Sequence, residues 1–148
     1  MDIDLAQFVP FVGHLHIASR ATTGGASAHL ADAEHLRNHL GSIHAGALFT
    51  LGETASGAAL VGHLGDLLGG SRVVTRSASI AYERIAHGDL EAEAVFRMPA
   101  VDIRTALARD GRVQFDLDVT LRDGAEQTVA TMVVTWNAQA RTADRAQN

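Results

Sequence analysis

Four residues between Asn38 and Glu53 have the types and the spacing that acyl chemistry needs. His44 follows Asn38 by six residues, and the carboxylate of Glu53 follows His44 by nine. Ala45 stands where an apolar, helix-forming run begins, so its backbone N–H would lie unpaired at the positive end of a helix dipole. Attack on an acyl carbon requires such a donor for the developing oxyanion and a carboxylate that activates water or attacks directly. The segment is therefore a candidate hydrolytic site.

This segment resembles the signature of the hotdog-fold thioesterases of the phenylacetic-acid-degradation type. In that family an Asn or Gln, a His-Gly-Gly and an Asp or Glu on the central helix follow one another at the same two intervals. A second stretch, Ile80–Leu90, is similar to the family's turn between two strands, with its Gly-Asp-Leu. The resemblance covers residues 13–137. It implies an α+β hotdog fold, in which an antiparallel sheet wraps around a long central helix.

The resemblance implies that the chain hydrolyses an acyl-CoA thioester to a free acid and CoA. Glu53 is then the general base or the nucleophile, the Ala45 N–H is the oxyanion donor, and the Asn38 amide orients the substrate or the attacking water. We expect His44 to fix the turn before the helix rather than to act as a base. Ala45 departs from the glycine that is usual in the family, and its methyl group is free of strain only if the residue has a negative φ.

The distance along the helix predicts how such a site is assembled. Glu53 lies eight residues beyond Ala45, which corresponds to about 12 Å at the rise of an α-helix. One thioester carbonyl cannot contact both groups at hydrogen-bonding distance. We therefore expect a homodimer with two equivalent sites at its interface, each taking Asn38 and Ala45 from one chain and Glu53 from the other. Whether such dimers pair into a homotetramer is left open.

Three further residues are expected to bind the substrate. Gly46 and Thr54 belong to the same helical run, and Arg84 follows the strand after it. A guanidinium suits phosphate recognition, so Arg84, Arg76 and Arg112 are candidates for contacts with the CoA phosphates. No separate cofactor is expected, because CoA enters as part of the substrate.

Plainer roles compete with these assignments. Asn38 could be an ordinary turn or helix cap, and His44 could serve only to bond the backbone. A hotdog module that binds acyl-CoA without hydrolysing it would need the same tunnel, and it is the alternative function. A hydratase or dehydratase of this fold is disfavoured, because the chain lacks an Asp-x-Asn-Pro-apolar-His stretch.

The eight histidines raise the question of a metal site. His14 and His16 would share a strand face, and His35 and His39 have the spacing of one helix face. The second pair lacks the glutamate of the zinc-protease motif, and no cysteine or cluster of carboxylates completes a ligand shell. We therefore expect no metal.

One long apolar run predicts the helix that would carry the site. It spans about Gly46 to Gly62, and Glu53 is its only charged residue. A helix that is apolar all round must be buried. Gly52 and Gly57 lower its helix propensity, so we expect another element to pack closely against its backbone there.

Alternating apolar and polar residues predict the strands of the sheet. In the run Val73–Tyr82 we expect Val74, Ala78, Ile80 and Tyr82 on one face, with Arg76 as an interruption. Short turn-like segments predict that the four later strands form one antiparallel meander. The predicted strands are Gly13–Ser19, Ser27–Ala31, Val73–Tyr82, Leu90–Met98, Val113–Leu121 and Thr128–Trp136, with Met98–Arg109 as a longer connection.

Composition sets the outer limits of the interpretation. The 148 residues suit one domain, for which we expect residues 1–137, followed by a disordered polar tail at 138–148. A net charge of −5 argues against a nucleic-acid surface. The absence of cysteine, of a basic signal-like start and of a long unbroken apolar run predicts a cytoplasmic protein that does not enter a membrane.

Overall fold

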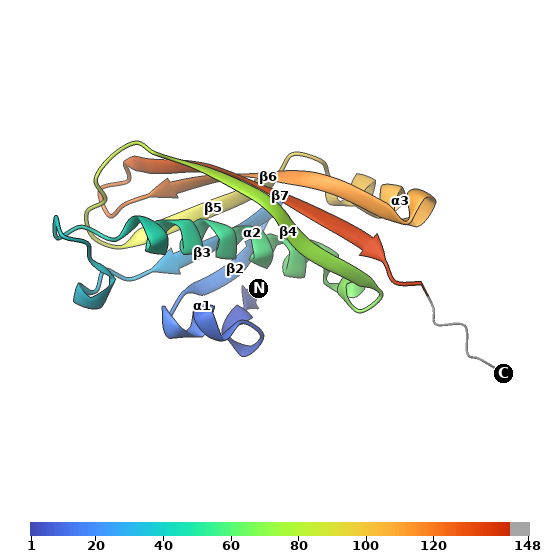
Figure 1. Ribbon diagram of the computed structural model, residues 1–148, viewed down its shortest axis with the longest axis horizontal. Coiled ribbons are helices and arrows are strands. Elements are labelled where there is room, and N and C mark those ends of the chain that lie inside the picture. The colour runs from blue at the N-terminus through green and yellow to red at the C-terminus, as the bar shows by residue number, and fades with distance from the viewer. Residues whose placement is uncertain (143–148) are drawn as a thin grey trace.

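In the computed structural model, which describes residues 1–142, one sheet wraps around one long helix (Figure 1). The elements in chain order are β1 Asp2–Ile3, a 3₁₀ turn Leu5–Gln7, α1 Pro10–His14, β2 Ala18–Thr22, β3 Gly25–Leu30, a 3₁₀ turn Glu34–Leu36, α2 Ala45–Leu68, β4 Ser71–Tyr82, β5 Leu90–Phe96, α3 Ala100–Asp110, β6 Arg112–Arg122 and β7 Thr128–Ala140. The α+β architecture with a central helix is the one predicted.

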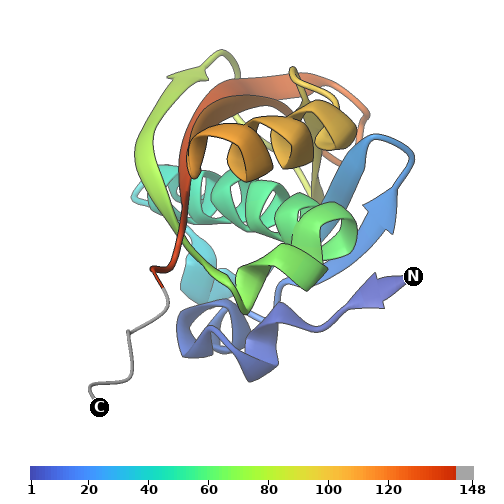
Figure 2. The ribbon, with the colours of Figure 1, turned by 90° about the vertical axis from the view of Figure 1, so that its right-hand side faces the viewer.

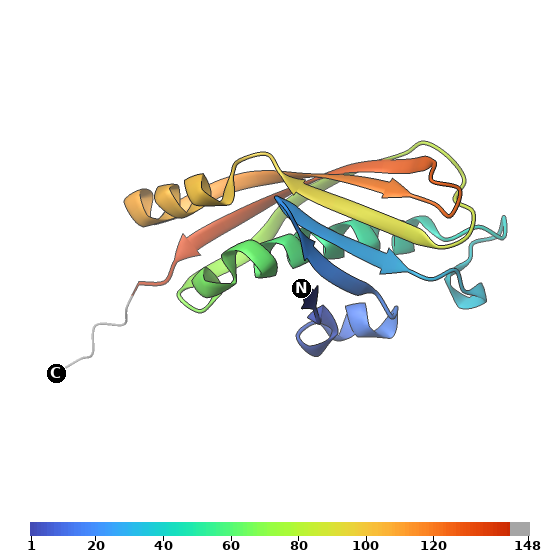
Figure 3. The same ribbon diagram turned by 180° about the vertical axis from the view of Figure 1, so that it is seen from behind.

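The seven strands follow the order β1-β2-β3-β5-β6-β7-β4, and every neighbouring pair is antiparallel. Seen from the back, β2, β3 and β5 lie side by side (Figure 3). The predicted meander of four strands is wrong in one respect. Strands β5, β6 and β7 form a meander, but β4 pairs with β7 at the edge of the sheet instead of with β5. Alternation shows which face of a strand is buried, but it does not show which strand lies beside it.

The connection from β4 to β5 crosses the end of the β6–β7 hairpin, where Asp123 holds it. This carboxylate is only 5% exposed, and it accepts hydrogen bonds from the backbone N–H groups of His87, Ala125 and Gln127. The Gly124 N–H donates in turn to the His87 carbonyl. Burial acts to raise the pKa of Asp123, but the backbone donors outweigh it and the pKa falls below its ordinary value.

Helix α2 runs through the core, as its apolar sequence predicts, and it continues six residues beyond the predicted end at Gly62. Leu51, Ala55, Ala58 and Ala59 have no exposed surface. The expected close approach is found at Gly52, where a Cβ would lie 2.7 Å from the Met132 sulfur. It is not found at Gly57, where the nearest atom would be 3.9 Å away.

A β-bulge in β4 changes which residues face the helix. The register with β7 shifts between Thr75 and Ser77, so the alternation of inward and outward residues changes phase there. Val74 is therefore exposed, whereas Ala78 and Ile80 pack against the core. The expectation that Val74 shares one face with Ala78, Ile80 and Tyr82 is wrong, because the extra residue at Arg76 separates Val74 from the others.

Two helices were not predicted. The expected strand Gly13–Ser19 is instead the end of α1, which starts at Pro10, followed by a turn into β2. Proline is favoured at the first position of a helix because its missing N–H is not needed there. Helix α3 occupies the expected connection Met98–Arg109, and it buries Ile103 and Leu107 over the C-terminal half of α2 (Figure 2).

Strand β7 continues to Ala140, so the first residues of the expected tail belong to the sheet, and Ala138 is buried. The remainder of that tail, 143–148, lies outside the described residues. Among residues 1–142, no helix combines the length and the apolarity needed to cross a membrane.

Gly62 and Gly65 provide a matched test of the packing between α2 and β2. A Cβ at Gly62 would lie 2.9 Å from the Ala21 Cβ, whereas a Cβ at Gly65 would meet nothing within 4 Å. Gly65→Ala should raise the free energy of unfolding by about 0.5–1 kcal/mol, because alanine loses less backbone entropy in a helix. Gly62→Ala should lower it by about 1–3 kcal/mol, because β2 must move. Urea unfolding at matched protein concentration measures both, and an equal gain from both substitutions would contradict this packing.

Candidate active site

The first turn of α2 is fixed by His44, which immediately precedes the helix. Its Nδ1 accepts a hydrogen bond of 2.8 Å from the Gly46 N–H, and its carbonyl accepts from the N–H groups of Ala47 and Leu48. The ring thus acts as an N-cap, satisfying one of the N–H groups that a helix leaves unpaired. This is the turn-fixing role expected of His44. The Gly46 N–H is occupied by it and is not available to a ligand.

The N–H of Ala45 is the one that remains open. Ala45 is the first residue of α2, and among residues 1–142 its N–H has no hydrogen-bond acceptor. The residue has a negative φ, so its methyl group is unstrained, which meets the condition set for alanine in place of glycine. Its carbonyl accepts a hydrogen bond of 3.1 Å from the Tyr82 hydroxyl, which ties the end of β4 to this turn.

Asn38 caps the turn that leads into the helix. Its Oδ1 accepts from the N–H groups of Leu40 and Ser42, at 2.9 and 3.2 Å, and its Nδ2 donates to the Ser42 hydroxyl at 3.0 Å. The plainer role considered for Asn38 is therefore present in the structure. A side-chain amide has two N–H donors, so the second one is still available to a ligand.

A hollow of about 320 Å³ brings three of the expected residues together. We call it the Tyr82 hollow; Asn38, Ala45 and Arg84 line it with Tyr82, and Leu48 and Ile85 add apolar wall. The exposed Arg84 is held at its rim by a hydrogen bond of 3.3 Å to the Gln127 side chain. One hollow therefore contains a residue that could bind an acyl carbonyl, Ala45, a side-chain amide donor, Asn38, and a guanidinium that could bind phosphate, Arg84.

Glu53 does not line the Tyr82 hollow. Helix α2 is unbroken from Ala45 to Glu53, which keeps the two residues about 12 Å apart along its axis. The Glu53 side chain is partly buried, and burial raises the pKa of its carboxyl above the ordinary value. A hydrogen bond of 3.2 Å from the Thr75 hydroxyl to Oε1 acts in the opposite direction.

Thr75 and Tyr82 contact the residues of this site, but no pattern in the sequence indicates it. The β-bulge at Arg76 puts Thr75 on the face of β4 that meets α2, where its hydroxyl reaches Glu53. The sequence shows that the alternation is broken near Arg76, but it does not show at which residue the register shifts. Tyr82, the only tyrosine of the chain, stands at the last position of β4. Its partner on α2 depends on how β4 crosses the helix.

The remaining expected residues lie apart from this site. Thr54 is 2% exposed, and its hydroxyl donates to the Thr50 carbonyl inside the helix. Arg76 is exposed at the bulge. Arg112 begins β6, at the end of that strand opposite to the turn that Arg84 contacts.

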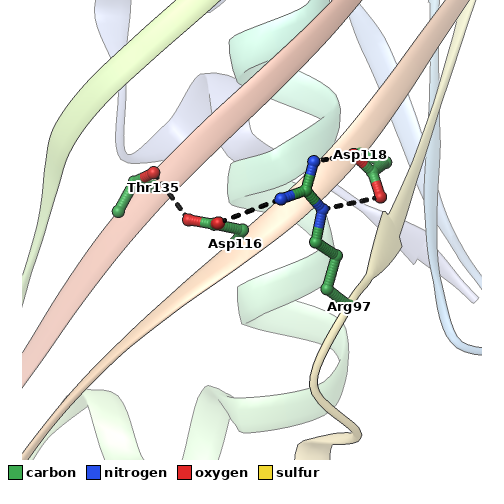
Figure 4. Close-up of polar contacts among 4 residues, drawn as sticks. All are labelled: Arg97, Asp116, Asp118 and Thr135. Carbon is green, nitrogen blue, oxygen red and sulfur yellow. Dashed lines mark hydrogen bonds and ion pairs between the residues drawn. The ribbon is translucent and has the colours of Figure 1, made fainter.

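Several charged groups elsewhere pair with one another. On the outer face of the sheet, Arg97 pairs with both oxygens of Asp118 and with Asp116, which also accepts a hydrogen bond from Thr135 (Figure 4). Among residues 1–142, no group of three His, Cys, Asp or Glu side chains is placed to hold a metal ion.

A known family model matches nearly the whole chain. The model of a family described as a domain of unknown function, DUF4442, matches residues 3–138. The chain belongs to this family. A search among curated proteins found no match.

Solved structures similar to this DUF4442 chain establish the hotdog fold. PA5026 of Pseudomonas aeruginosa, a protein of unknown function described as a probable thioesterase, is 23% identical, with 92% of this chain and 91% of that chain covered and a TM-score of 0.77. PaaI of the Escherichia coli phenylacetic acid degradation operon is 19% identical, with 93% of this chain and 88% of that chain covered and a TM-score of 0.68. BH2602 of Bacillus halodurans, solved with CoA, is 20% identical, with 88% of this chain and 76% of that chain covered and a TM-score of 0.68. The predicted fold is thereby confirmed.

The environment of Glu53 can be tested without any assay of activity. Carbon-13 NMR titration of the Glu53 carboxyl, assigned by its loss in Glu53→Gln, should give a pKa above that of exposed glutamates, because burial disfavours the charged form. Thr75→Val should raise this pKa further, because it removes a donor to the carboxylate, whereas Thr75→Ser should leave it near the wild-type value. An ordinary pKa in the wild type, or no effect of Thr75→Val, would contradict the described contacts.

Proposed function

We propose that the protein is an acyl-CoA thioesterase, which hydrolyses an acyl thioester to a carboxylic acid and CoA. The observation that carries the proposal is that Ala45, whose N–H has no acceptor among residues 1–142, lines the same hollow as Asn38 and Arg84. A backbone donor at a helix N-terminus stabilises an oxyanion at no cost in reorganisation, because its direction is already fixed.

In the proposed reaction the carbonyl oxygen of the thioester accepts a hydrogen bond from the Ala45 N–H. Glu53 as general base removes a proton from water while the water oxygen bonds to the carbonyl carbon, and the oxyanion forms at Ala45. The C–S bond then breaks, and the CoA thiolate takes the proton back from Glu53. Direct attack by the Glu53 carboxylate, followed by hydrolysis of the anhydride, is the alternative route. A carboxyl with a raised pKa is suited to the base role near neutral pH.

The Glu53 that acts on each substrate comes from a second copy of the chain in this proposal. The separation along α2 prevents Glu53 from reaching a carbonyl that is bound at Ala45 of its own chain. Strand β4 supports an assembly of two copies, because it is 12 residues long and pairs only with β7 among the described strands. Long open edges are normally covered, and a two-fold pairing there would make two equivalent sites.

The similar structures support the proposed substrate. PA5026 is described as a probable thioesterase, and BH2602 was solved with CoA. In this chain Arg84 at the rim of the Tyr82 hollow is the proposed phosphate contact. The Gly46 N–H, which is bound by His44, donates to no substrate atom in this scheme, and the buried Thr54 has no direct role in it.

A protein that binds acyl-CoA without hydrolysing it is the second candidate. It is favoured by the hydrogen bonds of Asn38, which serve the turn at Ser42. Turnover distinguishes the two functions, because only the thioesterase releases free CoA from a panel of short, medium, long and aryl acyl-CoAs.

Glu53→Gln should lower kcat at least about a thousandfold, because the amide can neither take a proton from water nor attack the carbonyl. Glu83→Gln is the matched control, because Glu83 is a glutamate that lines the Tyr82 hollow of its own chain but is exposed and accepts a hydrogen bond from Thr131. We expect that control to change kcat by less than about threefold. Free thiol release measures both, with thermal unfolding as the test of folding. An unchanged rate in Glu53→Gln, or loss of activity in Glu83→Gln alone, would overturn the assignment.

A further inference from the structure

Two hollows adjoin the first turn of α2, and only the Tyr82 hollow takes part in the proposed reaction. The second, which we call the Phe11 hollow, has a volume of about 200 Å³. Its apolar wall comes from α1, from the turn Glu34–Leu36 and from α2, and consists of Phe11, Leu15, Leu36 and Ala47. Ala45 lines the Tyr82 hollow and Gly46 lines the Phe11 hollow. The two spaces therefore diverge from adjacent residues.

The two hollows differ in whether their arginine is free. Arg84 stands at the Tyr82 hollow and has no carboxylate partner among residues 1–142, while the one carboxylate of that hollow, Glu83, is hydrogen bonded to Thr131. The one guanidinium of the Phe11 hollow, that of Arg37, is paired with Asp32 at 3.2 Å. The free guanidinium of Arg84 suits the phosphates of CoA, whereas the apolar wall of the Phe11 hollow suits an apolar group.

The exposure of α1 points in the same direction. Phe8, just before α1, is 75% exposed, and Phe11 within it is 58% exposed, so this segment presents apolar surface that a ligand can cover. Only Phe11 of the two lines the hollow. Apart from its chain neighbours and the helix backbone, the only atoms that a Cβ at Gly46 would meet within 4 Å are those of the His44 ring, at 3.1 and 3.4 Å, so no other element covers the helix turn there.

We infer that the Phe11 hollow binds the acyl group, and that the preferred substrates carry an apolar acyl group larger than acetyl. The inference rests on the proposed function. The carbonyl carbon of a thioester carries the acyl group on one side and the sulfur of CoA on the other. With the carbonyl oxygen at the Ala45 N–H, the CoA part follows the Tyr82 hollow towards Arg84. The acyl group then passes Gly46 and lies against Phe11, where each methylene that leaves water adds to the binding energy.

Phe11→Ala tests the inference, with Phe8→Ala as the matched control on the same segment. Phe11→Ala should lower the ratio of kcat/KM for hexanoyl-CoA over acetyl-CoA about tenfold, and the ratio for benzoyl-CoA over acetyl-CoA similarly, because the larger acyl groups lose their contact surface. Phe8→Ala should change these ratios by less than about twofold. Thermal unfolding of both variants verifies that they fold.

An equal loss for all three thioesters in Phe11→Ala, an unchanged ratio, or the same change in Phe8→Ala would overturn the inference. So would a weaker self-association of Phe11→Ala with unchanged ratios, which would show that a second copy covers the hollow. If the wild type hydrolyses none of the thioesters, the proposed function fails. Binding then still decides the inference: wild type should bind hexanoyl-CoA more tightly than CoA, Phe11→Ala should lose that preference, and equal affinities in the wild type would refute it.

Discussion

The first N–H groups of an α-helix point away from every carbonyl of that helix, and something outside it must satisfy them. In this protein the constraint falls on a helix that is packed into a sheet along its length, as the contact of Gly52 with Met132 shows. The His44 ring takes the Gly46 N–H, and the His44 carbonyl takes those of Ala47 and Leu48. The Ala45 N–H is left over, and Ala45 lines a hollow that a ligand can enter.

In the proposed reaction, the rigidity of the same helix requires the carboxylate to come from a second copy of the chain. An unbroken α2 places Ala45 and Glu53 too far apart to act on one carbonyl. Its burial also raises the pKa of Glu53, while the bulge in β4 turns Thr75 towards that carboxylate. The open edge of β4 could serve both needs. A second copy of the chain that pairs there would protect the strand and would complete the proposed site.

The sequence was sufficient for features that depend on local pattern. The apolar run around Glu53 predicts a buried helix, and alternation locates five of the strands. It was insufficient where neighbours in space decide. The position of β4 beside β7, the partners of Thr75 and Tyr82, and the burial of Thr54 all depend on how the chain crosses itself. Helix α1 was missed because five residues carry too little periodicity to outweigh a short alternation.

Complementation between two variants tests the shared site most directly. Chains with Glu53→Gln and chains with Asn38→Ala should each be nearly inactive alone. After subunit exchange, half of the dimers combine the two, and each such dimer has one intact site, so the mixture should recover about a quarter of the wild-type activity. Absence of recovery, once mass spectrometry has shown that mixed dimers form, would contradict a site shared between two chains.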